Sequence, residues 1–159
     1  LHLFGKPRHV FADLRKTRPG TEVIDLFEIL LYYPSLRVRL KSGYYFKEPI
    51  PAFQLHGTKG SFIKTRSDRQ EVDLDKGHVP MGENWGVDAV SDYGLLHVDG
   101  SSPERIPSEK GNFMAFYENV YQSLREGAQP AVPGEDGIAS MRVIDAAYES
   151  LEKQAVITY

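Results

Sequence analysis

Four neighbouring stretches decide the fold: VIDLFEILLYY at residues 23–33, LRVRLK at 36–41, FQLH at 53–56 and, after the turn GTKG at 57–60, SFIKT at 61–65. In the first stretch apolar residues occupy both alternating sets of positions, which predicts a strand covered on both faces. In the second, Leu36, Val38 and Leu40 alternate with basic residues, as in an antiparallel strand with one solvated face. The turn between the last two predicts a hairpin, with Gly60 in the left-handed position after a type I turn.

Further strands are expected on both sides of this region. Residues 8–16 alternate, with Val10, Ala12 and Leu14 on one side. Residues 65–93 are polar and largely aperiodic, with a brief strand expected around Val72 and Leu74. Residues 95–98 and 105–108 flank an Asp-Gly hairpin turn, and a short edge strand is expected at residues 156–157.

Two helices are expected near the C-terminus. The first begins at Asn112 as N-cap and ends at Gly127. The second begins near residues 133–136, where two acidic residues suit a helix N-terminus, and runs to Lys153. Its predicted apolar stripe consists of Ile138, Met141, Ile144, Ala147 or Tyr148, and Leu151.

Strands followed by helices, without alternation, predict the α+β class. We expect a largely antiparallel, open-faced sheet with helices packed on one face. The other face still carries apolar residues, and large apolar patches are rarely left exposed. That face is therefore expected to meet an oligomer partner or another domain; in the alternative, the long loop covers it.

Composition narrows the classes of protein that remain. The 159 residues suit one domain spanning residues 1–159, and the net charge of −3 gives no electrostatic reason to expect nucleic acid or an anionic membrane as partner. The chain has no cysteine, which excludes disulfides and thiolate metal sites. No apolar run has the length of a membrane span, so we expect a cytoplasmic protein.

The first residues resemble the end of a helix. Leu1-His2-Leu3-Phe4 is followed by Gly5, which suits a left-handed cap, and by Pro7, which cannot continue a helix. We interpret this pattern as a piece of a longer protein; the alternative is an apolar terminus left by processing.

Motifs for most common chemistries are missing. The five histidines show no metal-ligand spacing, and no Gly-x-Ser-x-Gly elbow or Gly-x-Gly-x-x-Gly nucleotide fingerprint occurs. Four residues remain as candidates for binding a small polar substrate, because each joins a hydrogen-bonding group or an aromatic face to an expected sheet end or loop: Arg18, Tyr45, Lys47 and Trp85. For each of them the alternative is an ordinary solvated or packed surface side chain.

Several segments together resemble the C-terminal domain of Gfo/Idh/MocA oxidoreductases, in the branch that includes scyllo-inositol dehydrogenases. These segments are FGKP at residues 4–7, RPG at 18–20, VIDLFE at 23–28, LHGTKGSFIK at 55–64, and GNF at 111–113 with FY and Asn119 beyond it. The segment HGTKGSF at residues 56–62 is the most specific of them.

This resemblance implies a two-domain enzyme. An N-terminal Rossmann domain, absent from this chain, would bind NAD or NADP; this chain would contribute the pocket for a polyol or sugar substrate and a homo-oligomer interface through its sheet face. The family's Glu-Lys-Pro and Asp-x-x-x-His motifs are absent here, so no catalytic and no cofactor-binding residue is carried over, and the chain alone is expected to be inactive. Two departures, Ile24 where the family tends to be acidic and the aromatic run at residues 44–46, leave the substrate open. The competing hypothesis is a free-standing α+β module that dimerises or binds a small ligand without catalysis.

Overall fold

A computed structural model describes residues 1–66 and 68–159. The described chain forms two compact units: residues 1–47 together with 129–159, and residues 48–128.

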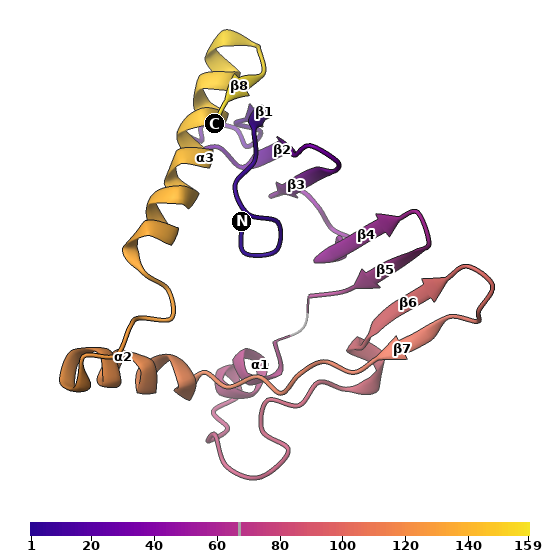
Figure 1. Cartoon of the computed structure of the whole chain (residues 1–159), viewed down its shortest axis with the longest axis vertical. Helices are drawn as coiled ribbons and strands as arrows, with labels where there is room; N and C mark the ends of the chain where they lie inside the picture. The colour runs from indigo at the N-terminus through magenta and orange to yellow at the C-terminus, as the bar shows by residue number, and fades with distance from the viewer. Residues whose placement is uncertain (67) are drawn as a thin grey trace. The chain divides into compact units, whose positions relative to one another are not determined.

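The first unit is a four-stranded sheet with one long helix (Figure 1). Its strands follow the order β3-β2-β1-β8, and neighbouring strands are antiparallel. The elements are β1 (His9–Arg15), β2 (Leu26–Tyr32), β3 (Arg37–Gly43), α3 (Gly134–Lys153) and β8 (Ile157–Thr158). The predicted central strand, its two neighbours and the C-terminal edge strand are thus confirmed.

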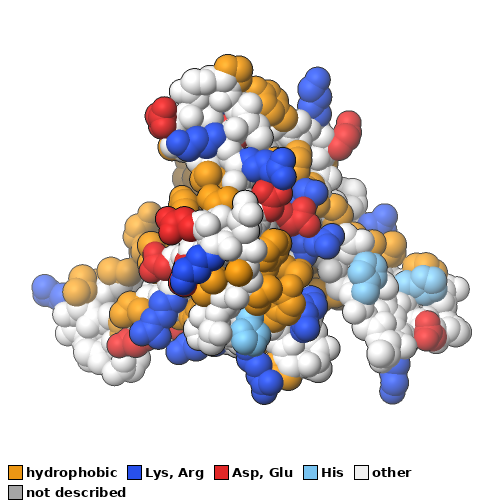
Figure 2. Space-filling model, turned by 90° about the horizontal axis from the view of Figure 1, so that it is seen from above, with side chains coloured by type: hydrophobic (Ala, Val, Ile, Leu, Met, Phe, Trp, Pro, Cys, Tyr) orange, Lys and Arg blue, Asp and Glu red, His pale blue; other side chains and the backbone are white. Residues whose placement is uncertain are grey.

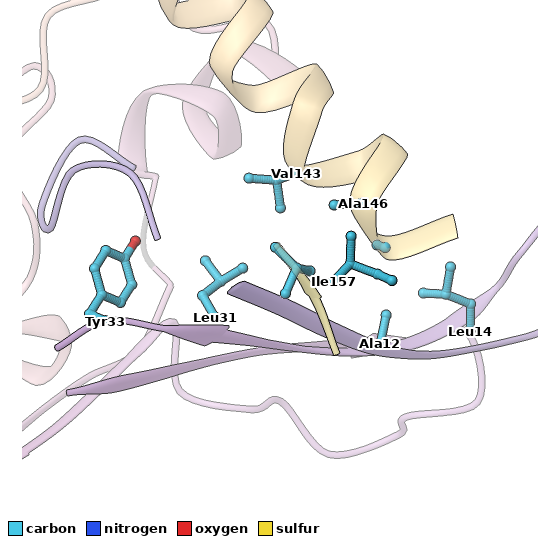
Figure 3. Close-up of a cluster of buried hydrophobic side chains, with 9 residues drawn as sticks. Ala12, Leu14, Leu31, Tyr33, Val143, Ala146 and Ile157 are labelled. Carbon is cyan, nitrogen blue, oxygen red and sulfur yellow. The ribbon is translucent and has the colours of Figure 1, made fainter. Parts of the chain in front are cut away.

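The core of this unit lies between the sheet and α3. In Figure 3 side chains of the strands, among them Ala12, Leu14 and Leu31, point toward the helix, and Val143 and Ala146 point back from it. Alternate residues of β1 are buried, as the pattern predicted. The sheet is therefore covered by α3 on one face.

The face by which α3 packs differs from the predicted stripe. Ala147 is buried and Leu151 packs on the core, but the other predicted positions are exposed: Ile138, Met141, Ile144 and Tyr148. The buried face is made of small residues instead: Ala139, Val143, Ala146, Ala147 and Ser150. Small side chains let a helix approach a sheet closely, and this selects the alanine face over the larger apolar one.

Ser150 of α3 joins this helix to β1 and to the turn before β8. Its side chain is fully buried; the hydroxyl oxygen accepts a hydrogen bond from the Ala12 backbone N–H at 3.0 Å, and the hydroxyl O–H donates to the Ala155 carbonyl at 2.7 Å. Strand β8 pairs with β1 only at residues 9 and 10, so beyond that point Ser150 supplies the partner that Ala12 needs.

The second unit contains a separate four-stranded sheet in the order β4-β5-β6-β7, again antiparallel. Its strands are β4 (Phe53–Gly57), β5 (Gly60–Lys64), β6 (Gly94–Val98) and β7 (Glu104–Ile106). The helical elements are α1 (Arg69–Asp75), the short 3-10 helix η1 (Val90–Asp92) and α2 (Met114–Glu126). Both predicted hairpins are present, and Gly100 has the left-handed conformation that an Asp-Gly turn requires.

The prediction for Gly60 was wrong in its reason. Gly60 does not have a positive φ; it pairs with Gly57 across the hairpin and with Val98 on the other side. A Cβ atom at this position would lie 2.5 Å from the carbonyl oxygen of His97. Glycine is therefore required by the close approach of β6 and not by the turn.

The brief strand expected around Val72 and Leu74 was also wrong, because these residues lie in α1. Asp68 is the N-cap and accepts a hydrogen bond from the Glu71 backbone N–H at 3.2 Å. The apolar residues of this helix are exposed, whereas the polar Gln70 and Asp73 are buried. The start of α2 was misplaced by one residue, since Phe113 and not Asn112 is its N-cap, while Gly127 ends it in the left-handed conformation as predicted.

The α+β class with antiparallel open sheets is confirmed, although the strands form two sheets and not one. Apolar side chains reach the surface among charged ones in the view of Figure 2. None of the helices in the described chain combines the length and apolar composition of a membrane span.

Candidate functional site

Arg18, the first predicted binding residue, lies in the first unit beside a buried carboxylate. Its Nε atom is 2.9 Å from Oδ2 of Asp25, and its guanidinium lies 4.3 Å from the ring centroid of Tyr44. Only 5% of the Asp25 side chain is exposed. Oδ1 of Asp25 accepts hydrogen bonds from the Thr17 backbone N–H at 2.6 Å and from the Thr17 hydroxyl at 2.8 Å.

These contacts set the charge state of Asp25. Burial by itself would raise the pKa of this carboxyl, but the hydrogen bonds from Thr17 and Arg18 favour the charged form and lower the pKa well below its usual value. Arg18 thus forms an ion pair with Asp25, and this pair connects the two ends of the loop between β1 and β2.

Tyr45 and Lys47 lie beyond the end of β3, in the same unit. Tyr45 is exposed and packs edge-on against Tyr44, with ring centroids 5.3 Å apart. Lys47 is exposed and forms no ion pair with a described residue. The aromatic run therefore joins Arg18 to Tyr45 through Tyr44, whereas Lys47 stands apart from that contact chain.

Trp85, the fourth candidate, belongs to the second unit and is half-buried in the segment after α1. Its indole Nε1 donates a hydrogen bond to Oε1 of Gln70 at 3.2 Å, and the same oxygen accepts from the Phe113 backbone N–H at 3.1 Å. Gln70 is almost fully buried and so ties α1, the Trp85 segment and the start of α2 together.

An open cavity of about 510 Å³ lies at the surface beside Trp85, and much of its lining is exposed to solvent. Its lining combines ionisable, amide and apolar side chains: Arg69, Asp73, His78, Val79, Met81, Asn84, Trp85, Val87 and Ala89. This volume is in the range of small-molecule sites, which join apolar walls to a few polar groups. All of its residues come from α1 and the segment that follows it.

Within the cavity, Asp73 and its neighbours form a polar row. Arg69 Nε is 3.1 Å from Oδ2 of Asp73, and His78 Nδ1 is 3.5 Å from Oδ1. Asp73 is 9% exposed, and its Oδ1 is a buried oxygen to which no described residue donates a hydrogen bond. Neither Asp73 nor His78 stands out in the sequence, whose pattern predicts an irregular loop with a brief strand in this segment.

A second cavity, of about 420 Å³, is lined by Lys64 together with Arg69 and Gln70 of α1 and other residues of the second unit. Lys64 Nζ donates to the Asp92 carbonyl and the Ser108 hydroxyl, both at 2.8 Å, and is 3.2 Å from Oδ2 of Asp88. These contacts hold loop segments against β5. Among the described residues no group of three or more His, Asp or Glu side chains is placed to bind a metal ion.

The antiparallel open sheets and separate helices place the chain in the α+β class, and its second unit carries an open cavity with polar, apolar and aromatic lining. Residues 1–158 match the family model described as the oxidoreductase family, C-terminal alpha/beta domain. The chain belongs to this family, the C-terminal domain of the Gfo/Idh/MocA oxidoreductases, and the resemblance drawn from its motifs is confirmed.

Individual relatives cover the whole chain. The scyllo-inositol 2-dehydrogenase (NADP(+)) IolW of Bacillus subtilis strain 168 is 38% identical over 99% of this chain and 45% of its own length. The uncharacterized oxidoreductase YdgJ of Escherichia coli K12 is 31% identical over 98% of this chain and 45% of its own length. The chain therefore spans about half the length of these curated relatives.

Solved structures show the same fold. YvaA of Bacillus subtilis, classed as an oxidoreductase, matches with a TM-score of 0.91 at 37% identity, over 99% of this chain and 46% of that protein. An oxidoreductase from Bacillus cereus matches with a TM-score of 0.84 at 28% identity, over 99% of this chain and 47% of that one.

Proposed function

We propose that residues 1–159 are the C-terminal, substrate-side domain of an NAD(P)-dependent oxidoreductase that acts on a polyol or sugar. The observation that carries this proposal is the 38% identity, over nearly the whole chain, to a scyllo-inositol 2-dehydrogenase that uses NADP(+). The length of that relative leaves room for a further domain, which we propose to be an N-terminal Rossmann domain.

We propose that an N-terminal domain binds the cofactor and that this chain binds the substrate. Its sequence contains no Gly-x-Gly-x-x-Gly fingerprint, so NAD or NADP would be bound by the N-terminal domain. The nicotinamide, when bound there, supplies hydride transfer. This chain would supply side chains that hold and orient the hydroxylated substrate, with Arg18, Tyr45, Lys47 and Trp85 as the candidates from sequence.

A homo-oligomer through the sheet face is part of the proposal. On the face of the first unit's sheet opposite α3, Phe11 lies across from Leu30, and Tyr32 continues this apolar row along β2. Glu28 on the same face pairs with Arg39 and Lys41 at 3.0 and 3.3 Å. An apolar centre with charged surroundings is the composition of many subunit interfaces.

The test is an assay of the longest reading frame that contains this chain. The purified product is incubated with NAD or NADP in oxidised form and with scyllo-inositol, myo-inositol or glucose, and reduced nucleotide is followed by absorbance. We expect turnover of at least one polyol. A folded product that reduces neither nucleotide with any of these substrates, or a reading frame that begins at this chain, contradicts the proposal.

A further inference from the structure

We propose that the cavity between α1 and Trp85 binds an uncharged, ring-shaped polyol, and that His78, oriented by Asp73, accepts a hydrogen bond from one of its hydroxyls. This inference rests on the proposed function and adds to it the binding residues in the second unit.

The end of α1 brings His78 back over the helix. Lys76 caps the helix, and Gly77 takes a left-handed conformation with φ of +77°. This reversal lets the His78 backbone N–H donate to the Asp73 carbonyl at 2.9 Å. The imidazole is thereby held on the Asp73 side of the cavity, with its Nδ1 atom 3.5 Å from Oδ1.

The buried carboxylate then selects the tautomer of His78. A buried carboxylate oxygen without a donor is costly, and Oδ1 of Asp73 accepts no hydrogen bond from a described residue. A proton on His78 Nδ1, which lies 3.5 Å from Oδ1, would be directed at this oxygen. In the tautomer with hydrogen on Nδ1, Nε2 is an acceptor, and this side chain is 60% exposed and lines the cavity.

The remaining lining indicates the class of ligand. Arg69 and Asp73 are the charged residues of the lining and are paired at 3.1 Å, so the wall offers little net charge to an ionic ligand. Asn84 can donate and accept, and the guanidinium of Arg69 retains further donors. Mixed donors and acceptors around a cavity match a molecule with several hydroxyls.

The apolar wall completes the match. The indole N–H of Trp85 is used by Gln70, so Trp85 contributes carbon surface to the cavity, together with Val79 and Met81. A ring-shaped polyol has a C–H face that packs on such a surface and hydroxyls that reach polar groups at its edge. Because Arg69 and Asp73 are paired, the lining offers no net charge that would favour a cation or an anion.

Binding in the cavity can be followed by tryptophan fluorescence, because Trp85 lines the cavity and is the single tryptophan of the chain. Tryptophan emission of the 159-residue chain is recorded during titration with scyllo-inositol, with choline and inorganic phosphate as charged comparison ligands. We expect a saturable change with scyllo-inositol alone. His78→Ala should weaken this binding by about tenfold or more, whereas His97→Ala, on β6 and outside the cavity lining, should leave it unchanged.

Asp73→Asn separates orientation from packing. Nitrogen-15 NMR of labelled histidine should show the Nδ1–H tautomer for His78 in the original chain and its loss in the variant, while circular dichroism remains that of the folded chain. A folded original chain without a saturable response, or a response that persists in both the His78 and Asp73 variants, overturns the proposal.

Failure of this inference and failure of the proposed function are distinguishable. If the longer enzyme oxidises scyllo-inositol but His78→Ala leaves its KM unchanged, the proposed oxidoreductase function is supported. The proposed polyol site at His78 is then contradicted. If the chain binds scyllo-inositol through His78 but the longer protein transfers no hydride, the proposed polyol site is supported. The proposed oxidoreductase function is then contradicted.

Discussion

At the residue scale, buried polar side chains hold this chain together at points where backbone pairing is incomplete. The Asp25 carboxylate accepts hydrogen bonds from the backbone N–H groups of Thr17 and Arg18, in the loop between β1 and β2. Ser150 accepts one from the Ala12 backbone N–H, beyond the residues of β1 that pair with β8. Each takes the role of a missing backbone contact, and each yields a prediction because a substitution weakens or removes that contact.

Asp25→Asn should destabilise the first unit. It should also reduce the slope with which the free energy of unfolding falls at acid pH. The folded-state pKa of Asp25 lies below the ordinary value of about 3.9, so its contribution is fully present above that pH and is lost as pH falls through the lower value. Urea denaturation from about pH 6 to about pH 2 measures this. Asp13→Asn, in the exposed pair with Arg15, is the control and should change the curve little. An Asp25 variant with the original acid slope would contradict the assignment.

Ser150→Ala should cost about 1–3 kcal/mol in the free energy of unfolding, because the Ala12 N–H and the Ala155 carbonyl both lose their partner. Ser140→Ala is matched to it, since Ser140 lies on the same helix but is exposed and bonds only to the preceding turn at Asp136. We expect that change to stay within about 0.5 kcal/mol. Equal losses in the two variants would show that the buried hydroxyl is not the cause.

At the element scale, the strands were predictable and the polar helix was not. The alternation in β1 and the both-sided apolar pattern of β2 are direct consequences of strand geometry, and each correctly placed its strand. In α1 the signal is inverted, since Val72 and Leu74 are exposed while Gln70 and Asp73 are buried. Apolar periodicity predicts a helix only where the buried face is apolar. It therefore does not indicate α1, whose buried face is polar.

Helix α3 shows a second limit of the same kind. Its extent was predicted closely, yet the larger apolar residues were assigned to the buried face that alanines and Ser150 occupy. The candidate site shared this limit: Trp85 was found from composition, but its neighbours Asp73 and His78 depend on the turn at Gly77, which periodicity does not report.

The β4–β5 hairpin yields a prediction with a built-in control. Gly60→Ala should destabilise the second unit by about 1–3 kcal/mol, because the added methyl would meet the His97 carbonyl at 2.5 Å. Gly57→Ala, on the paired position, places its methyl 3.7 Å from the Gly60 carbonyl and should be tolerated. Thermal denaturation of both variants decides; a more damaging Gly57 change would contradict the close-approach explanation.

At the scale of the whole molecule, the sheet face opposite α3 should join two copies of the chain. Light scattering is expected to report a dimer or larger species, and Phe11→Glu should shift it toward monomer by placing a charge in the apolar row. Val132→Glu, at an exposed linker position, is the control. A strict monomer at high concentration, or a Phe11 variant that associates as before, would contradict the predicted interface.

The binding of reduced nucleotide tests most directly whether residues 1–159 are, as proposed, the substrate-side part of a nicotinamide-dependent enzyme. The 159-residue chain and the product of the longest reading frame that contains it are each titrated with NADH and NADPH while nucleotide fluorescence is recorded. We expect saturable binding of at least one nucleotide by the longer protein and none near micromolar concentrations by the chain alone. Saturable micromolar binding by the 159-residue chain, or no binding by the folded longer protein, would contradict it.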